Sequence, residues 1–133
     1  MNPCLEEAER LLRLARRDRL ACATLIALPE LASSVACFHA QQAAEKALKA
    51  LMTLHGVEFR RTHDLEELAA RLEHAGQTLP VSEPDLIRLT PYAVEFRYND
   101  DAMPLIDPAD ALSLADTLIA WCDTQIKTRR PSE

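Results

Sequence analysis

The stretch FHAQQAAEKALKAL at residues 38–51 places alanines on one side of a helix and polar side chains on the other. At about 100° per residue, the apolar positions in and around it form an arc wide enough to contact two neighbouring helices. This arc comprises Ala36, Ala40, Ala43, Ala44, Ala47, Leu48, Ala50, Leu51 and Leu54. Residues 31–55 are therefore predicted to be the central helix of a bundle.

The composition supports a helical fold. The chain has 21 Leu and 21 Ala but only 4 Val and 5 Ile, so side chains that suit helices outnumber the β-branched ones that suit strands. Both of its glycines, Gly56 and Gly76, fall where a helical pattern ends. We expect an all-α protein.

Hydrophobic periodicity predicts five helices joined by short loops. They are expected at residues 5–27, at 31–55, from Thr62 or Asp64 to Gly76, from Ser82 onward, and from the Asp107-Pro108 cap to Thr128. This order predicts an up-and-down four-helix bundle with an additional short helix. At 133 residues the chain is expected to be a single domain, residues 1–133, with a frayed tail at 129–133.

Two local signals make more specific predictions. Asp64 and Glu67 have the spacing of a capping box at the start of the third helix. Pro91 lies six or seven residues into the fourth helix, where it removes a backbone hydrogen bond, so we expect a kink that re-aims residues 92–98.

Charge and cysteine usage exclude several classes of protein. A formal net charge of -6 disfavours a general nucleic-acid coat but leaves room for a local basic groove. The cysteines Cys4, Cys22, Cys37 and Cys122 show no CxxC spacing and are expected to be reduced thiols, with no metal site and no cofactor.

With no signal-peptide pattern and no membrane-length apolar run, the protein is expected to be soluble and cytoplasmic.

A polar row follows the side of the central helix opposite the alanines. His39, Gln42, Lys46, Lys49 and Thr53 recur at alternating spacings of three and four residues. Such a row is suited to binding a phosphate. It is equally typical of the solvated side of an amphipathic helix, where a Glu45–Lys49 pair adds about 0.3 kcal/mol.

Three segments together resemble the HEPN domain family of prokaryotes. They are CFHAQQAAEKALKALMTLHG, then THDLEELAARL, then YAVEFRYND before a final amphipathic helix. The similarity extends over nearly the whole chain. Its most specific part is a string that reads, in order, an aromatic residue, His, Ala, Gln, Gln, Ala, any residue, Glu and Lys.

The resemblance implies a helical bundle that commonly dimerises and has a cleft between its central helices. Members of the family include metal-independent ribonucleases and modules that accompany minimal nucleotidyltransferases in two-gene toxin-antitoxin systems, and nucleotide binding has been proposed for the family. A shared fold does not choose among these functions.

The ribonuclease members carry an Arg followed four to six residues later by a His. The corresponding residue here is Arg97, and no His occurs anywhere after it. The motif is absent, so the resemblance favours a protein that is not an enzyme.

His63 and Arg97 each allow two interpretations. His63 follows Arg60 and Arg61, so it is placed either to act near a phosphate or to serve a structural role, as a cap of the third helix or a hydrogen-bond partner of a loop carbonyl. Arg97 lies among Tyr92, Phe96 and Tyr98. This position suits either recognition of a base and phosphate or a structural ion pair with Glu45 or Asp64. The acidic loop that follows at 99–101 opposes RNA binding.

The predicted ligand-binding residues are Gln42, Lys46, His63 and Arg97. We interpret the chain as a nucleotide- or nucleic-acid-binding module of a toxin-antitoxin-like system, a homodimer that works with a minimal nucleotidyltransferase and not with a membrane. The alternatives are a metal-independent ribonuclease toxin with a nonstandard active site and a purely structural helical adaptor.

Overall fold

A computed structural model of the chain describes residues 2–28, 33–94 and 105–130. The elements are α1 (Pro3–Ile26), α2 (Ser33–Leu54), α3 (Leu65–His74), α4 (Glu83–Leu89), a 3₁₀ turn η1 (Thr90–Ala93) and α5 (Pro108–Arg129). Every regular element in these three ranges is helical. This confirms the predicted all-α class.

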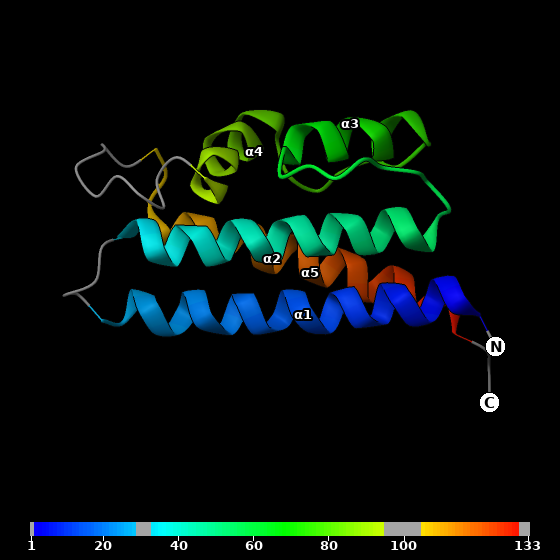
Figure 1. The fold of residues 1–133 in the computed structure, drawn as a ribbon, viewed down its shortest axis with the longest axis horizontal. Coiled ribbons are helices and arrows are strands. Elements are labelled where there is room, and N and C mark those ends of the chain that lie inside the picture. The colour runs from blue at the N-terminus through cyan, green and yellow to red at the C-terminus, as the bar shows by residue number, and fades with distance from the viewer. Residues whose placement is uncertain (1, 29–32, 95–104, 131–133) are drawn as a thin grey trace.

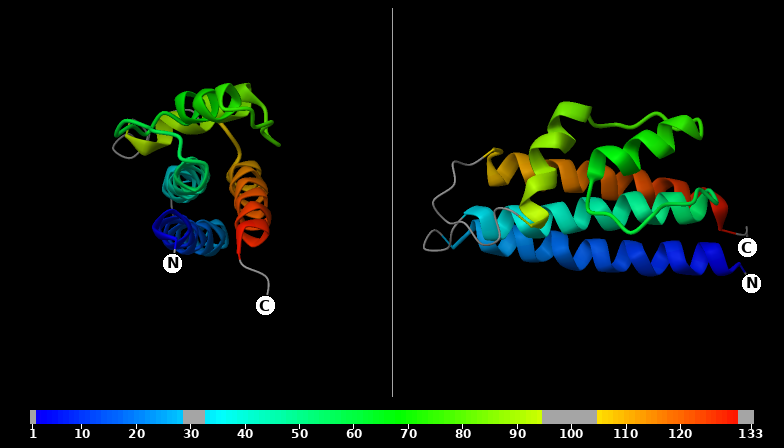
Figure 2. Two further views of the ribbon diagram at one scale, coloured as in Figure 1. Left: turned by 90° about the vertical axis from the view of Figure 1, so that its right-hand side faces the viewer. Right: turned by 45° about the horizontal axis from the view of Figure 1, so that its top comes forward.

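The three long helices α1, α2 and α5 lie alongside one another, and the short helices α3 and α4 form a layer across the bundle (Figures 1 and 2). The α2 helix contacts every other element, including η1. The bundle therefore has α2 at its centre, as the alanine-lined stretch predicts.

Nearly all sides of α2 are buried, because α1, α5 and the α3–α4 layer each cover part of it. Its alanines at 40, 43, 44, 47 and 50 are inaccessible to solvent, as are the larger Leu48, Leu51 and Met52. Small side chains let the backbone of a neighbouring helix approach closely, while the leucines fill the space between layers.

Three helix starts are fixed by side chains that accept from free backbone N–H groups. Asn2 Oδ1 accepts from Cys4 N at 3.1 Å, Ser82 Oγ from Asp85 N at 3.4 Å and Asp107 Oδ1 from Ala109 N at 2.9 Å. The starts predicted at Ser82 and at Asp107 are confirmed.

Both glycines end helices in the left-handed conformation, with φ of 67° at Gly56 and 97° at Gly76. After α2, Val57 N donates to Met52 O at 2.8 Å, and after α3, Gln77 N donates to Leu72 O at 3.0 Å. These are the six-to-one hydrogen bonds of the Schellman motif. Both predicted helix ends are confirmed.

The predicted capping box at α3 is wrong. Asp64 holds the N-cap position, but its side chain makes no cap hydrogen bond, and Glu67 instead pairs with Arg60 at 2.9 Å. The first N–H of the helix, on Leu65, donates to Oγ1 of Thr90 in η1 at 3.1 Å. A tertiary contact has replaced the local cap.

The chain does not form a kinked helix at Pro91. The α4 helix ends at Leu89 and η1 follows, because the tighter 3₁₀ turn accommodates a proline near its start. Tyr92 points inward, is 1% exposed and accepts from Leu105 N through its hydroxyl at 2.9 Å. It is a core residue and not an aromatic face for a ligand. The rest of the segment that the kink was predicted to re-aim, residues 95–98, lies outside the described ranges.

All four cysteines are free thiols. Burial raises the pKa of Cys22 to about 11 and the pKa values of Cys37 and Cys122 to about 12, whereas Cys4 is exposed. Among the described helices, none has the length and apolarity needed to cross a membrane.

Candidate functional site

A connected set of polar side chains runs along α2, from its contact with α1 to the loop before α3. We call it the α2 network, and it comprises Asp18, His39, Gln41, Gln42, Glu45, Lys46, Lys49 and His63. Much of the polar row predicted on α2 therefore faces other protein groups and not open solvent.

Glu45 is the centre of one half of this network and is only 6% exposed. Its Oε1 atom lies 2.8 Å from Nδ1 of His63 and accepts from the amide of Gln41 at 3.3 Å. Its Oε2 atom accepts from Nζ of Lys49 at 3.0 Å, which confirms the predicted i,i+4 pair. Three donors thus compensate the buried carboxylate.

Gln41 is fully buried and ties the loop before α3 to the centre of the bundle. Its amide nitrogen donates to the backbone carbonyl of His63 at 2.9 Å, and its Oε1 accepts from the amide of Gln42 at 2.8 Å. A buried amide with both ends bonded fixes the position of the groups that it contacts.

Asp18 of α1 is the centre of the other half. It accepts from Nζ of Lys46 at 2.5 Å and lies 3.0 Å from Nδ1 of His39. Lys46 also approaches Oε1 of Gln42 at 3.4 Å, which connects the two halves. The charge of Lys46 is therefore offset by a partly buried carboxylate.

Three of the four predicted ligand-binding residues, Gln42, Lys46 and His63, belong to the α2 network. Arg97 lies outside the described residues, so the structure does not place it beside the other three. His63 does not cap α3 with its side chain; its imidazole turns back to Glu45 instead.

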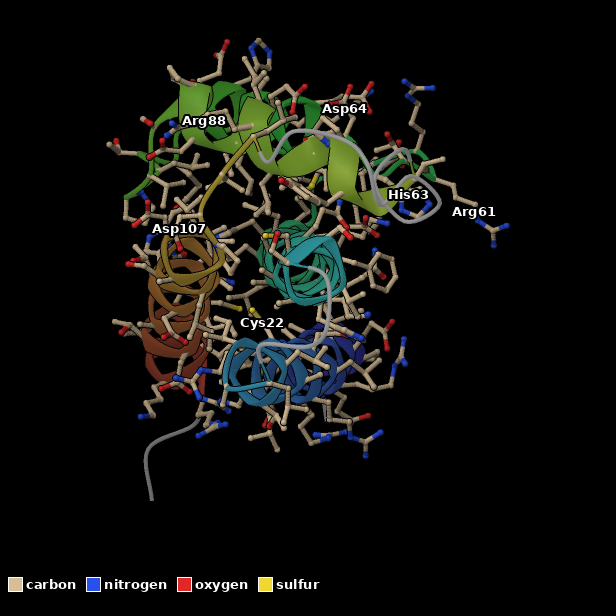
Figure 3. The ribbon with its side chains drawn as sticks, turned by 90° about the vertical axis from the view of Figure 1, so that its left-hand side faces the viewer. Cys22, Arg61, His63, Asp64, Arg88 and Asp107 are labelled. Carbon is tan, nitrogen blue, oxygen red and sulfur yellow. The ribbon has the colours of Figure 1, made fainter. Side chains whose placement is uncertain are left out.

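The exposed part of the site is the edge where His63 lies. Its side chain is 56% exposed although Nδ1 is bonded to a buried group. Arg61 extends away from the protein near His63 (Figure 3) and forms no ion pair with any residue in the described ranges. Lys49 lies 5.8 Å from the centre of the Phe59 ring, which places an aromatic side chain beside the same helix face.

Sequence reasoning missed Asp18 and Gln41 and treated Glu45 as a surface partner of Lys49. For Gln41 and Glu45 the sequence does contain a signal. Gln41 and Glu45 are four residues apart and lie between the apolar arc and the polar row, on a helix predicted to contact two neighbours. Polar residues at such positions indicate a buried polar contact.

A second polar cluster lies beside His63 at the start of α3. The Oδ1 atom of Asp64 is buried without a hydrogen-bond partner among the described residues. Its carboxyl group lies against Glu66, and the hydrogen bond that its protonated form can donate to that side chain, together with burial, raises the pKa of Asp64 to about 6. Glu66 in turn accepts from the Thr90 hydroxyl at 2.7 Å.

A shallow cavity of about 330 Å³ separates α4 from α5, on the opposite edge of the molecule from His63 (Figure 3). It is lined by Asp85, Arg88 and Asp110, together with apolar residues that include Ile106. Arg88 pairs with Asp85, so its charge is already compensated there. This cavity contains none of the predicted site residues.

Three long helices with a short pair laid across the central one, and a buried polar network on that central helix, define an all-α bundle domain. The chain belongs to the HEPN domain family, whose sequence model matches residues 2–125. This confirms the resemblance seen in the sequence.

Two solved structures share this architecture. The crystal structure of TT1696 from Thermus thermophilus is 28% identical to the chain, with a TM-score of 0.71. That of ST0689, an archaeal HEPN homologue, is 24% identical with a TM-score of 0.60 and shows the fold alone. In both cases the match covers 90% of this chain and 98% of the other. No curated protein sequence matches the chain.

Proposed function

We propose that this HEPN-domain protein is a nucleotide- or nucleic-acid-binding module of a toxin-antitoxin-like system that works with a minimal nucleotidyltransferase. The observation that carries the proposal is the half-exposed imidazole of His63, which a buried Glu45 holds in place at the edge of the α2 network. An imidazole and a guanidinium near each other, His63 and Arg61, suit the oxygens of a phosphate.

The charges around this edge favour a small ligand. Lys46, Lys49 and Nδ1 of His63 already have carboxylate partners, which leaves Arg61 and Nε2 of His63 as the available groups at this edge among the described residues. A long nucleic acid needs many uncompensated cations, and the net charge of -6 opposes it. A nucleotide or a short single-stranded RNA fits this distribution of charge better.

Gln42, Lys46 and Arg97 complete the proposed site. Gln42 and Lys46 are connected to His63 through hydrogen bonds along the network. Arg97 is included because the corresponding position in the family is an arginine.

Cleavage of RNA without a metal ion is a second candidate, favoured by the contact between the Glu45 carboxylate and the His63 imidazole. A histidine in such a pair is suited to act as a general base. The absence of a His after Arg97 opposes this candidate. Absence of cleavage of short RNA in EDTA by the wild-type protein would exclude this candidate, and unchanged cleavage by a His63→Ala variant would exclude His63 as the general base.

The proposal is tested by thermal unfolding against a panel of nucleotides and short RNAs, because a ligand that binds only the folded state raises its stability. We expect the ligand-dependent rise in Tm to be lost in His63→Ala and reduced in Lys46→Ala and Arg97→Ala. The exposed His74 and Lys127 provide matched controls, and His74→Ala and Lys127→Ala should keep the full rise.

If no ligand in the panel changes Tm, the binding proposal is wrong and the structural adaptor becomes the favoured function. A change in Tm that all variants retain would place binding elsewhere on the molecule.

We further propose that the chain acts as one domain and as a homodimer, as many HEPN proteins do. Trp121 on α5 is partly buried against the core and leaves part of its ring for a second subunit. Sedimentation equilibrium should give about twice the chain mass of 14.9 kDa, and a monomer at micromolar concentration would contradict the proposal.

A further inference from the structure

The contact between Glu45 and His63 determines which imidazole nitrogen carries the proton. The Oε1 atom of Glu45 lies 2.8 Å from Nδ1 of His63. A carboxylate can only accept a hydrogen bond, so Nδ1 must be the donor. The other ring nitrogen, Nε2, is then the one that changes between an acceptor and a donor as His63 gains or loses a proton.

The ring and the backbone of His63 are held by the same buried pair on α2. Glu45 holds the ring, while the amide of Gln41 bridges Oε1 of Glu45 and the backbone carbonyl of His63 at 3.3 and 2.9 Å. Gln41 is fully buried and Glu45 is 6% exposed. A half-exposed side chain normally samples several rotamers, and this double attachment restricts that freedom.

We propose that Glu45 is a positioning residue that fixes His63 as the Nδ1–H tautomer and presents its Nε2 as a pH-switched contact for a phosphate oxygen. The identity of the ligand rests on the proposed function. The positioning of the ring does not, because it is a property of the free protein.

The switch follows from the chemistry of Nε2. In neutral His63 this nitrogen carries a lone pair that repels a phosphate oxygen; in the protonated ring it is a charge-assisted donor. Binding through it should therefore be stronger at lower pH, where the ring is protonated, than at higher pH, where it is neutral.

Other charged groups lie on the elements next to the ring and enter the design of the test. They are Glu45 and Lys49 on α2, Arg60, Arg61 and Asp64 in its own segment, and Glu66 and Glu67 at the start of α3. Asp64 gains a proton in the same range of pH as a histidine. An Asp64→Asn variant therefore separates its contribution from that of His63.

The first measurement is the tautomeric state of His63 in the free wild-type protein, from the nitrogen and carbon chemical shifts of labelled imidazole rings at about pH 8. We expect His63 to be the Nδ1–H tautomer. His74 is exposed on α3 and serves as an internal reference. Glu45→Gln should move the His63 shifts toward those of His74, and the Nε2–H tautomer in the wild type would overturn the proposal.

The second measurement is the affinity for a dinucleoside monophosphate, whose diester keeps one charge throughout the range studied. We expect wild-type affinity to fall about tenfold from about pH 5.5 to about pH 8, the size of one lost charge-assisted hydrogen bond. Asp64→Asn and His74→Ala should keep this dependence, and His63→Ala should abolish it. Glu45→Gln should weaken binding at the acidic end while circular dichroism shows the fold intact.

The two measurements separate the two proposals. A pH dependence that survives in His63→Ala overturns the contact between Nε2 and the phosphate, and wild-type affinity in Glu45→Gln overturns the role of Glu45 in binding, although binding itself is established. Absence of binding at every pH overturns the proposed function and the phosphate contact together, and the tautomer then decides by itself whether Glu45 positions the ring.

Discussion

The carboxyl group of Asp64 couples proton binding to folding at a single residue. Its pKa is about 6 in the folded protein, raised from 3.8 by the hydrogen bond to Glu66, by burial and by the charges of Glu66 and Glu67. Between these two values the folded state binds a proton that the unfolded state does not. The stabilisation is therefore fully present below the lower value and is lost as the pH rises through the higher one.

We expect the free energy of unfolding of the wild type to fall between about pH 4 and about pH 6.5. The fall should exceed that of Asp64→Asn by about 1 kcal/mol, a value that already allows for solvent screening. Urea denaturation across this range measures the difference. Glu73→Gln, an exposed change on the same helix, should keep the wild-type slope. Parallel slopes in Asp64→Asn and the wild type would show that Asp64 does not titrate in this way.

Two helices, α2 and α3, end through the backbone conformation of a glycine. At Gly56, φ is 67° and no atom beyond its chain neighbours lies within 4 Å of where a Cβ would be placed. The site has room for a side chain, so the preference for glycine there is conformational and not steric.

Gly56→Ala should destabilise the protein by about 1 kcal/mol, the cost of a left-handed conformation for an L residue with a Cβ. Gly56→Asn should cost less, because asparagine tolerates this conformation. Thermal unfolding of the three proteins measures the order. Equal stability of the alanine and glycine forms would mean that the turn relaxes to another conformation.

The stability of the whole molecule depends on α2, which contacts α1, α5 and the α3–α4 layer at once. Leu48 is completely buried on this helix, whereas Leu20 on α1 is 63% exposed. The same substitution at the two positions compares a site inside the bundle with one on its surface.

Leu48→Ala should lower the free energy of unfolding by about 2–5 kcal/mol, since it removes buried apolar contacts and leaves a cavity. Leu20→Ala should change it by less than about 0.5 kcal/mol. Urea denaturation of both variants measures the two effects. Similar losses would contradict the central position of α2 in the bundle.

The elements were largely predictable because their signals are local. The cap at Ser82 and the cap at Asp107 each act on a backbone group two or three residues away. The hydrogen bonds around Gly56 and Gly76 likewise join residues within five positions of each other. The alanine-lined arc then identifies the central helix, because only a helix covered from several sides needs so wide an apolar surface.

The sequence by itself thus determined the all-α class, the central helix and the family, together with three residues of the candidate site, Gln42, Lys46 and His63. The tertiary structure alone decided that Glu45 contacts His63 across 18 positions and that Thr90 replaces the local cap of α3 across 25. Such contacts depend on how helices pack, and a polar side chain on a helix face has several possible partners until the neighbouring helix is in place. The physical reason is that local hydrogen bonds are set by spacing along the chain, whereas the partner of a buried carboxylate is set by whichever donor the fold brings within its reach.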